Sequence, residues 1–434
     1  METRAQISRK IEVTDKKLSK IKLKVTNIPQ FQKRIEKTLS KNVTDLIELL
    51  LAGSVLLNVS DIHIEPKETN TRIRIRVDGI LQDVLDIPTK IYQTLLSRIK
   101  LLSEIKLNII DRPQDGRFSV LLGETPVEIR SSTLPAEHGE SIVLRILNPK
   151  SLIEVEALGV RKDLLEAFKK EIKRPNGMII VTGPTGAGKT TTQYAFLEKI
   201  NNPEIKIITI EDPIEYHLKG ISQTQVNPKK GYDFANGLKS IMRQDPDVIL
   251  VGEIRDIETV NIALQAALTG HLVFTTLHTN NAAGTIARLQ ALGGKPVNIA
   301  PALNMAIAQR LIRKVCKKCV KIEKVSPVDL QKLKKNLERI PKEKLPKKIT
   351  KDIKIPKTQG CEHCNFTGYR GRIGIFETIF ADEELENFIL TSPSISALEK
   401  KAKEKGMISM HQDGLLKVLE GITTLEEVER ITGE

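Results

Sequence analysis

The sequence has no tryptophan, few aromatic residues and only four cysteines among its 434 residues. With aromatic residues at 3%, it lacks the stacking side chains on which single-stranded nucleic acids commonly bind. A signal peptide is also missing, because residues 1–24 are polar and charged without an apolar core. The most apolar stretch, residues 46–59, contains Glu48 and Gly53 and is too short to span a bilayer. We therefore predict a soluble, cytoplasmic protein.

The net charge of +14 is concentrated in two segments. Residues 1–40 carry 11 Lys or Arg against 4 Asp or Glu, and residues 310–360 carry 18 against 5. The summed net charge of these two segments exceeds the net charge of the whole chain, so the rest of the chain is slightly acidic. This distribution does not describe a face for duplex DNA, and we expect no specific nucleic acid partner. Contact with an anionic membrane surface, contact with an acidic partner and a merely solvated surface all remain open.

Hydrophobic patterning divides the chain into two folded parts. Residues 1–40 are predicted to be a mobile basic tail or one marginal helix. A helical apolar run and several alternating strands then predict a small α+β domain, assigned as PAS-like, over residues 41–148. After a linker over residues 149–160, short apolar strands alternate with helices over residues 161–434. That alternation predicts an α/β fold, a parallel sheet with helices on both faces.

A phosphate-binding motif follows the first strand of the second part. Gly183-Pro184-Thr185-Gly186-Ala187-Gly188-Lys189-Thr190, followed by Thr191, matches the pattern G-x-x-x-x-G-K-[ST]. Glycines let the backbone curl so that its N–H groups point at a phosphate, and the next helix adds positive potential. We expect Lys189 to reach the β- and γ-phosphates of ATP and the Thr190 hydroxyl to bind Mg²⁺. A glycine-rich turn with a surface lysine is the weaker alternative.

Polar side chains follow three further strands. Glu211 and Glu215 come after one strand, Glu253 after another, and His271 and His278 bracket a third. Carboxylates at strand ends lie where α/β sheets bind ligands, and they can hold Mg²⁺ through water or polarise the attacking water. We place Glu211, His271 and His278 among the nucleotide-binding residues. For any single one of them, a structural role as a cap, an ion pair or a packed side chain is the alternative.

An ordered series of motifs resembles the secretion ATPase superfamily of type II secretion and type IV pili. The resemblance covers roughly residues 41–434. Its motifs include Pro113-Gln-Asp-Gly-Arg117, the phosphate loop, Glu211-Asp-Pro-Ile-Glu215, Val251-Gly-Glu-Ile-Arg-Asp256 and Leu277-His-Thr-Asn280.

This resemblance implies a RecA-like ATPase domain in a two-domain subunit that closes into a homohexamer, with ATP between the domains. It makes Glu215 the candidate general base, and Glu253 the Walker B glutamate that organises metal and water. Arg112, Arg117 and Arg130 match segments whose arginines reach the phosphates, sometimes across a subunit boundary. Ion pairs within the smaller domain are the alternative for each arginine.

All four cysteines fall in two pairs, Cys316-Lys-Lys-Cys319 and Cys361-Glu-His-Cys364. Two C-x₂-C turns can direct four thiolates at one point, which predicts a structural zinc site within an insertion over residues 310–375. Disulfides are disfavoured in a reducing cytosol, and His363 is predicted to be a bystander. Zinc sites of this kind resemble those of pilus extension and secretion ATPases, whereas retraction ATPases generally lack them. The C-terminal residues 382–434 are predicted to be helical.

These observations predict a hexameric ATP-hydrolysing motor that drives type IV pilus assembly through an inner-membrane platform protein. It would lie at the inner face of the cytoplasmic membrane. A type II secretion motor, a DNA-translocating ATPase and a scaffold that binds ATP without hydrolysis are the alternatives. Family members often carry a further N-terminal domain that docks onto membrane partners, whereas about 40 residues precede the matching region here. We hypothesise that the Lys-rich tail or insertion substitutes for it.

Overall fold

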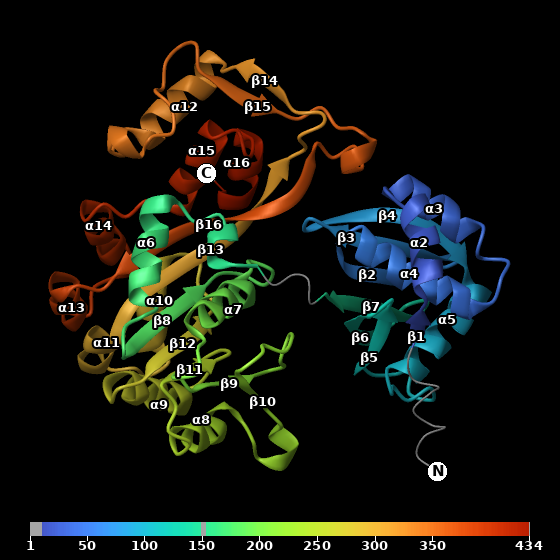
Figure 1. Cartoon of the computed structure of the whole chain (residues 1–434), viewed down its shortest axis with the longest axis horizontal. Helices are drawn as coiled ribbons and strands as arrows, with labels where there is room; N and C mark the ends of the chain where they lie inside the picture. Colours follow the sequence, from blue (N-terminus) through green and yellow to red (C-terminus); the bar gives the residue numbers. More distant parts are fainter. Residues whose placement is uncertain (1–10, 149–152, 434) are drawn as a thin grey trace. The chain divides into compact units, whose positions relative to one another are not determined.

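The computed structural model describes residues 11–148 and 153–433 (Figure 1). The chain folds into two compact units. The first holds the described residues up to 148 together with the cysteine segments Cys316–Val320 and Thr358–Arg370. The second holds the remaining described residues from 153 onwards. Residues 149–152 of the predicted linker lie outside the described residues.

The first unit is built on a seven-stranded sheet with the strand order β1-β5-β6-β7-β2-β3-β4. Its pairs are antiparallel except for the parallel pair of β1 with β5. Asp78 and Gly79 join β3 to β4 with positive φ at both residues, as a tight hairpin turn requires. The strands are β1 (Ile11–Val13), β2 (Val59–Pro66), β3 (Asn70–Val77), β4 (Ile80–Pro88), β5 (Gln114–Leu122), β6 (Thr125–Ala136) and β7 (Gly139–Leu147).

Residues 11–36 are folded into this unit, which differs from the predicted tail. They form β1 and the helices α2 (Asp15–Lys24) and α3 (Ile28–Glu36), and Phe31 and Ile35 are fully buried. These residues fold because their sequence is amphipathic, although the many lysines make the apolar pattern hard to recognise. Apolar side chains recur at helical spacing and enter the core, which also receives α4 (Val43–Leu56) and α5 (Thr89–Leu102), while many of the intervening lysines face solvent. Residues 1–10 of the predicted tail lie outside the described residues.

The second unit contains the predicted parallel sheet, with the strand order β10-β9-β11-β12-β8-β13-β16. Neighbouring strands from β10 to β13 pair in parallel. The predicted α/β fold is therefore confirmed. The strands are β8 (Gly177–Thr182), β9 (Ile207–Glu211), β10 (Ser222–Gln225), β11 (Val248–Val251), β12 (Leu272–Leu277), β13 (Leu303–Val315) and β16 (Tyr369–Phe380).

Helices cover both faces of this sheet. Every residue of β8 is buried, with Met178 and Ile180 in one hydrophobic core and Ile179 and Val181 in another. The first core includes residues of α8 (Phe234–Met242), α9 (Ile257–Leu268), α10 (Ala282–Ala291), α11 (Pro296–Ala302), α13 (Glu383–Leu390) and α14 (Ile395–Glu404). The second includes residues of α6 (Lys162–Glu171) and α7 (Lys189–Ile200). A strand buried on both faces explains the continuous apolar run of β8.

The Lys-rich segment forms a small lobe with its own core. It consists of β14 (Lys321–Lys324), α12 (Pro327–Leu337) and β15 (Lys354–Lys357), with β14 and β15 antiparallel. Its apolar side chains pack on the C-terminal helices α15 (Met410–Leu419) and α16 (Leu425–Thr432). Lys332 forms an ion pair with Glu429 at 2.7 Å, and Lys357 forms one with Glu426 at 2.5 Å. These two lysines therefore help to hold the lobe on α16.

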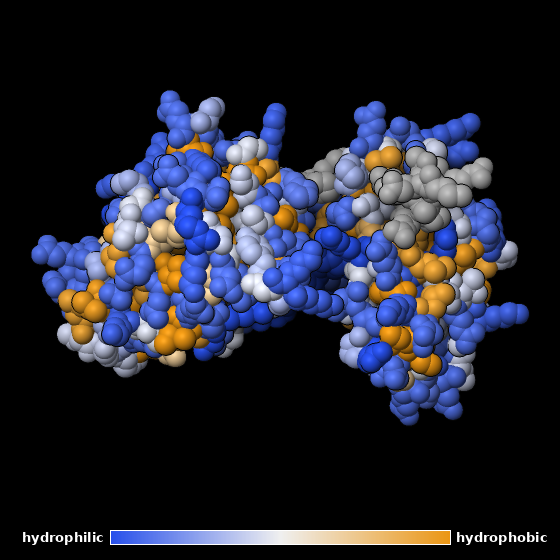
Figure 2. Space-filling model, turned by 90° about the horizontal axis from the view of Figure 1, so that it is seen from below, coloured by the Kyte–Doolittle hydropathy of each residue, from blue (hydrophilic) through white to orange (hydrophobic). Residues whose placement is uncertain are grey.

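The surface seen in Figure 2 is largely hydrophilic, with hydrophobic patches scattered among hydrophilic residues. Among residues 11–148 and 153–433, no helix combines the length and the hydrophobicity that a bilayer span requires.

Candidate nucleotide site and metal centre

The phosphate loop connects β8 to α7 in the second unit. Gly183 and Gly188 have φ of 149° and 88°, and a Cβ at Gly183 would lie 2.5 Å from the carbonyl oxygen of Gln309. Both positions therefore require glycine. Pro184, Thr185 and Gly186 are exposed, whereas Ala187 is buried against the fold. The exposed part of the loop and the first N–H groups of α7 are therefore arranged in a way that suits phosphate binding.

Lys189 is the first residue of α7, and its ammonium group reaches back over the loop. Its Nζ donates to the carbonyl oxygens of Gly183 at 2.8 Å and Pro184 at 3.3 Å. Burial lowers the pKa of Lys189, and the nearby carboxylate of Glu253 opposes that shift. Thr190 and Thr191 follow in the first turn of α7, both half-buried.

Glu253 lies two residues beyond β11, on the same edge of the sheet as the phosphate loop, because β8, β11 and β12 run in parallel. It forms an ion pair with Arg255, and its Oε2 lies 3.6 Å from Nε2 of His278. The pKa of His278 is lowered by its burial and by the charge of Lys189. The structure therefore brings Lys189, Glu253 and His278 together in one cluster.

His271 lies at the opposite edge of the sheet. It precedes β12, and its backbone oxygen accepts from the N–H of Gly177 at the start of β8. Its Nδ1 is 3.1 Å from the carbonyl oxygen of Ala266 in α9. A strand of six residues spans about 20 Å, so His271 is not brought to the phosphate loop of its own chain. This position fits the alternative role of a helix-capping side chain.

Glu211 and Glu215 follow β9 in different surroundings. Glu211 is buried, and its carboxylate accepts from Thr209 at 2.5 Å, from Gln223 at 3.2 Å and from the hydroxyl of Tyr194. Burial raises the pKa of Glu211. Glu215 is half-buried, and its backbone N–H donates to the Tyr194 hydroxyl at 3.4 Å. Glu211 therefore holds the fold of this segment, while Glu215 is the more accessible carboxylate.

The predicted arginines lie in the first unit. Arg112 is exposed just before β5, and Arg117 on β5 stands opposite Arg130 on β6. Arg130 in turn stands opposite Arg145 on β7, whose Nε donates to Asp61 at 3.0 Å. Directly opposed like charges destabilise a sheet, and Asp61 supplies a carboxylate to this row of arginines through Arg145. Sequence reasoning missed Arg145, because the register that aligns it with Arg130 is not visible in the sequence.

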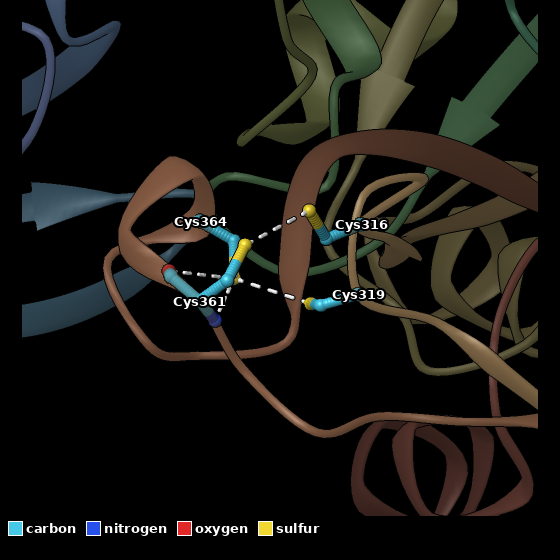
Figure 3. Close-up of side chains that lie close together, drawn as sticks. All are labelled: Cys316, Cys319, Cys361 and Cys364. Atoms are coloured by element: carbon cyan, nitrogen blue, oxygen red, sulfur yellow. Dashed lines mark hydrogen bonds between the residues drawn. The ribbon is translucent and has the colours of Figure 1, made fainter.

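The four cysteine side chains converge on one point (Figure 3). Their sulfur atoms all lie within 4.8 Å of one another, with 3.9 Å between Cys316 and Cys361 and 3.7 Å between Cys319 and Cys364. A disulfide needs about 2.05 Å, whereas a tetrahedral zinc–thiolate site with bonds of about 2.3 Å needs sulfurs about 3.8 Å apart. The donor set and its spacing therefore fit zinc. His363 stays outside the cluster, beside Arg370 at 2.8 Å.

The cysteine cluster is supported by backbone donors. The N–H groups of Cys361 and Gly368 donate to Sγ of Cys364 at 3.2 and 3.3 Å. Such N–H···S contacts orient metal-binding thiolates and balance their charge. In the same unit, Asn365 of this loop accepts from the backbone N–H of Ile28 at 2.7 Å.

The sheet and the loop together define a P-loop nucleotide-binding protein with a RecA-like ATPase domain. A family model described as "Type II/IV secretion system protein" matches residues 36–430. The chain therefore belongs to the type II/IV secretion system protein family.

Two named relatives show how close the match is. The chain is 42% identical over 410 residues to the type II secretion system ATPase E of Vibrio cholerae, covering 94% of this chain and 78% of the relative. It is also 42% identical over 383 residues to the type IV pilus assembly ATPase PilB of Thermus thermophilus. That match covers 88% of this chain and 42% of the Thermus protein.

Solved structures agree on the fold. The ATPase DotB of Legionella pneumophila superposes with a TM-score of 0.64 at 22% identity, covering 90% of this chain and 96% of that one. The pilus retraction motor PilT with bound ADP superposes with a TM-score of 0.58 at 27% identity and the same coverage.

Proposed function

We propose that this chain is the subunit of a homohexameric motor that hydrolyses ATP to drive type IV pilus assembly. The observation that carries the proposal is the cluster of Lys189, Glu253 and His278 beside the phosphate loop, in a member of a secretion ATPase family. One relative is a pilus assembly ATPase, which supports pilus assembly as the process that this motor drives. The type II secretion relative makes secretion the second candidate.

The residues of the site divide the work of hydrolysis. Lys189 would release its loop carbonyls to neutralise the β- and γ-phosphate oxygens, because an anion is the stronger partner for an ammonium group. Glu215 would accept the proton of the attacking water as general base. Thr190 and Glu253 would hold Mg²⁺, which when bound screens the charge of the phosphates. Arg112, Arg117 and Arg130 would spread the γ-phosphoryl charge over planar guanidinium groups.

We assign a structural zinc ion to Cys316, Cys319, Cys361 and Cys364. Support comes from four thiols with sulfur spacings near those of a tetrahedral site and with backbone donors at Cys364. Such an ion would hold two segments, 42 residues apart from Cys319 to Cys361, in one turn-rich knuckle. Its role would be to stabilise the fold, since four protein ligands leave no open position for catalysis.

We place the motor at the inner face of the cytoplasmic membrane, against a platform protein. Lysines of the lobe that face solvent, such as Lys347 and Lys348, are proposed to add attraction for anionic lipids. Binding to phosphatidylglycerol vesicles should weaken when both are replaced by glutamate. The matched control is the same change at the exposed pair Lys229 and Lys230, and equal binding by all three proteins would refute the lipid contact.

Complementation separates the two cargo candidates. The chain would be expressed in bacteria lacking their pilus assembly ATPase and in bacteria lacking their secretion ATPase. Restored pili without restored secretion would support pilus assembly, and the reverse would establish the second candidate. A Lys189→Ala variant is the control, because it should restore neither.

A further inference from the structure

Tyr194 links the helix of the phosphate loop to the segment that carries Glu215. It lies five residues after Lys189 on α7, and its side chain is fully buried. Its ring meets that of Tyr216 edge to face, with 5.0 Å between the centroids. Packing therefore fixes where the Tyr194 hydroxyl points.

The hydroxyl of Tyr194 has three hydrogen-bond partners. It donates to Oε2 of Glu211 at the end of β9, and it accepts from the backbone N–H of Glu215 and from Nε2 of Gln223 on β10, both at 3.4 Å. Burial raises the pKa of Tyr194, so the phenol keeps its proton and remains a donor. One buried group thus joins α7, β9 and the loop after β9.

Gln223 of β10 holds the other side of the same loop. Its Nε2 donates to the carbonyl oxygen of Tyr216 and to Glu211, both at 3.2 Å. Its Oε1 accepts the N–H of Leu218 at 2.7 Å. Thr209 adds a third donor to Glu211 at 2.5 Å. The buried carboxylate of Glu211 accepts three hydrogen bonds. Because a buried acceptor that loses a donor costs free energy, we expect the loop to shift when one of these bonds is removed.

We infer that Tyr194 is a positioning residue for Glu215, acting through its hydroxyl on the Glu215 backbone and on Glu211. It transmits the placement of the phosphate-loop helix to the candidate general base without touching the nucleotide. This inference rests on the proposed role of Glu215 in ATP hydrolysis. Its signature is a loss of turnover that leaves nucleotide binding intact, because Lys189 and the loop glycines keep their positions.

The Tyr194→Phe variant tests this inference, because it removes the hydroxyl and keeps the ring. We expect kcat to fall about tenfold, the effect of one lost hydrogen bond to a charged group. KM for ATP and the Kd for ADP should stay within about twofold, which corresponds to a change in binding free energy of about 0.4 kcal/mol or less. The matched control is Tyr232→Phe, which removes a hydroxyl that donates to Thr224 at 3.0 Å and should keep normal turnover.

A double-mutant cycle with Glu211→Gln asks whether the hydroxyl acts through Glu211. The losses should be less than additive if the two residues act as one unit. If Tyr194→Phe does not fold, Gln223→Leu takes its place, with the same split between kcat and KM expected. Unchanged kcat, or a loss of ADP affinity that matches the loss of turnover, would overturn the inference.

Glu215→Gln distinguishes this inference from the proposed function. If Glu215→Gln abolishes turnover while Tyr194→Phe has none of the expected effect, the positioning role alone is refuted. If Glu215→Gln retains normal turnover, the general-base assignment itself fails, and the inference fails with it.

Discussion

His278 and Glu253 face each other across two neighbouring strands, with 3.6 Å between Nε2 and Oε2. Glu253 follows β11 and His278 follows β12, so the parallel sheet itself sets this distance. The hydroxyl of Thr276 donates to the carbonyl oxygen of Gly252 at 2.6 Å and ties the two strand ends together. Glu253 and His278 are therefore already in position to face a nucleotide bound by Lys189.

The His278 imidazole should titrate below its usual range. Its pKa is lowered by burial and by the charge of Lys189. Below pH 6.5 the unfolded chain would bind a proton more readily than the folded chain, so this residue lowers the free energy of unfolding as pH falls. NMR titration of histidine-labelled protein, assigned with His278→Asn, measures the pKa directly. A pKa of His278 above 6.5 would contradict this electrostatic account.

Removing the metal from the cysteine cluster should destabilise the protein. We expect about one zinc per chain, and a Cys361→Ser variant should lose it and melt at least about 5 °C lower. Elemental analysis and thermal unfolding measure the two effects. The control is His363→Ala, two residues away and outside the cluster, which should keep both zinc and stability. Full zinc content in Cys361→Ser would refute the four-cysteine site.

The buried ion pair of Lys100 and Glu140 should be costly to break. The two side chains are 2% and 7% exposed and lie 2.8 Å apart, and Lys100 also donates to the carbonyl oxygen of Ile109. Lys100→Met leaves a buried carboxylate unpaired, which should lower the free energy of unfolding by about 3–5 kcal/mol. Urea unfolding measures it, with the exposed Lys90→Met on the same helix as control. A loss equal to that of the control would mean that water reaches the pair.

Alanine at Gly183 should damage nucleotide binding. Its Cβ would lie 2.5 Å from a backbone carbonyl oxygen of β13, at a φ of 149°. Since the backbone cannot yield cheaply, the loop must shift, and we expect ADP affinity to fall at least about tenfold. Fluorescence titration with labelled ADP measures the effect. Gly231→Ala is a control for a strained glycine in open space, and it should bind ADP normally.

Motifs of short span were predictable from the sequence. The phosphate loop and the two C-x₂-C turns are local patterns whose spacing carries their chemistry, and the buried strand β8 is a plain apolar run. The helices over residues 15–36 were missed because lysine dominates their composition, although Phe31 and Ile35 follow helical spacing.

Contacts between distant elements were beyond sequence reasoning. Tyr194 gave no signal, since a buried tyrosine on a helix resembles any core residue, and its partners come from β9 and β10. His271 and His278 looked equivalent at the two ends of one strand. Only the direction of β12 against β8 shows that His278 lies at the edge of the phosphate loop and His271 at the other.

The ATPase activity of the purified protein tests the central claim most directly, measured together with its mass by light scattering. We predict Mg²⁺-dependent turnover by a hexamer, abolished by Lys189→Ala and by Glu253→Gln, with Tyr232→Phe as an active control. A folded, zinc-loaded protein that binds ATP without turning it over, or one whose Lys189→Ala variant keeps its activity, would contradict the motor.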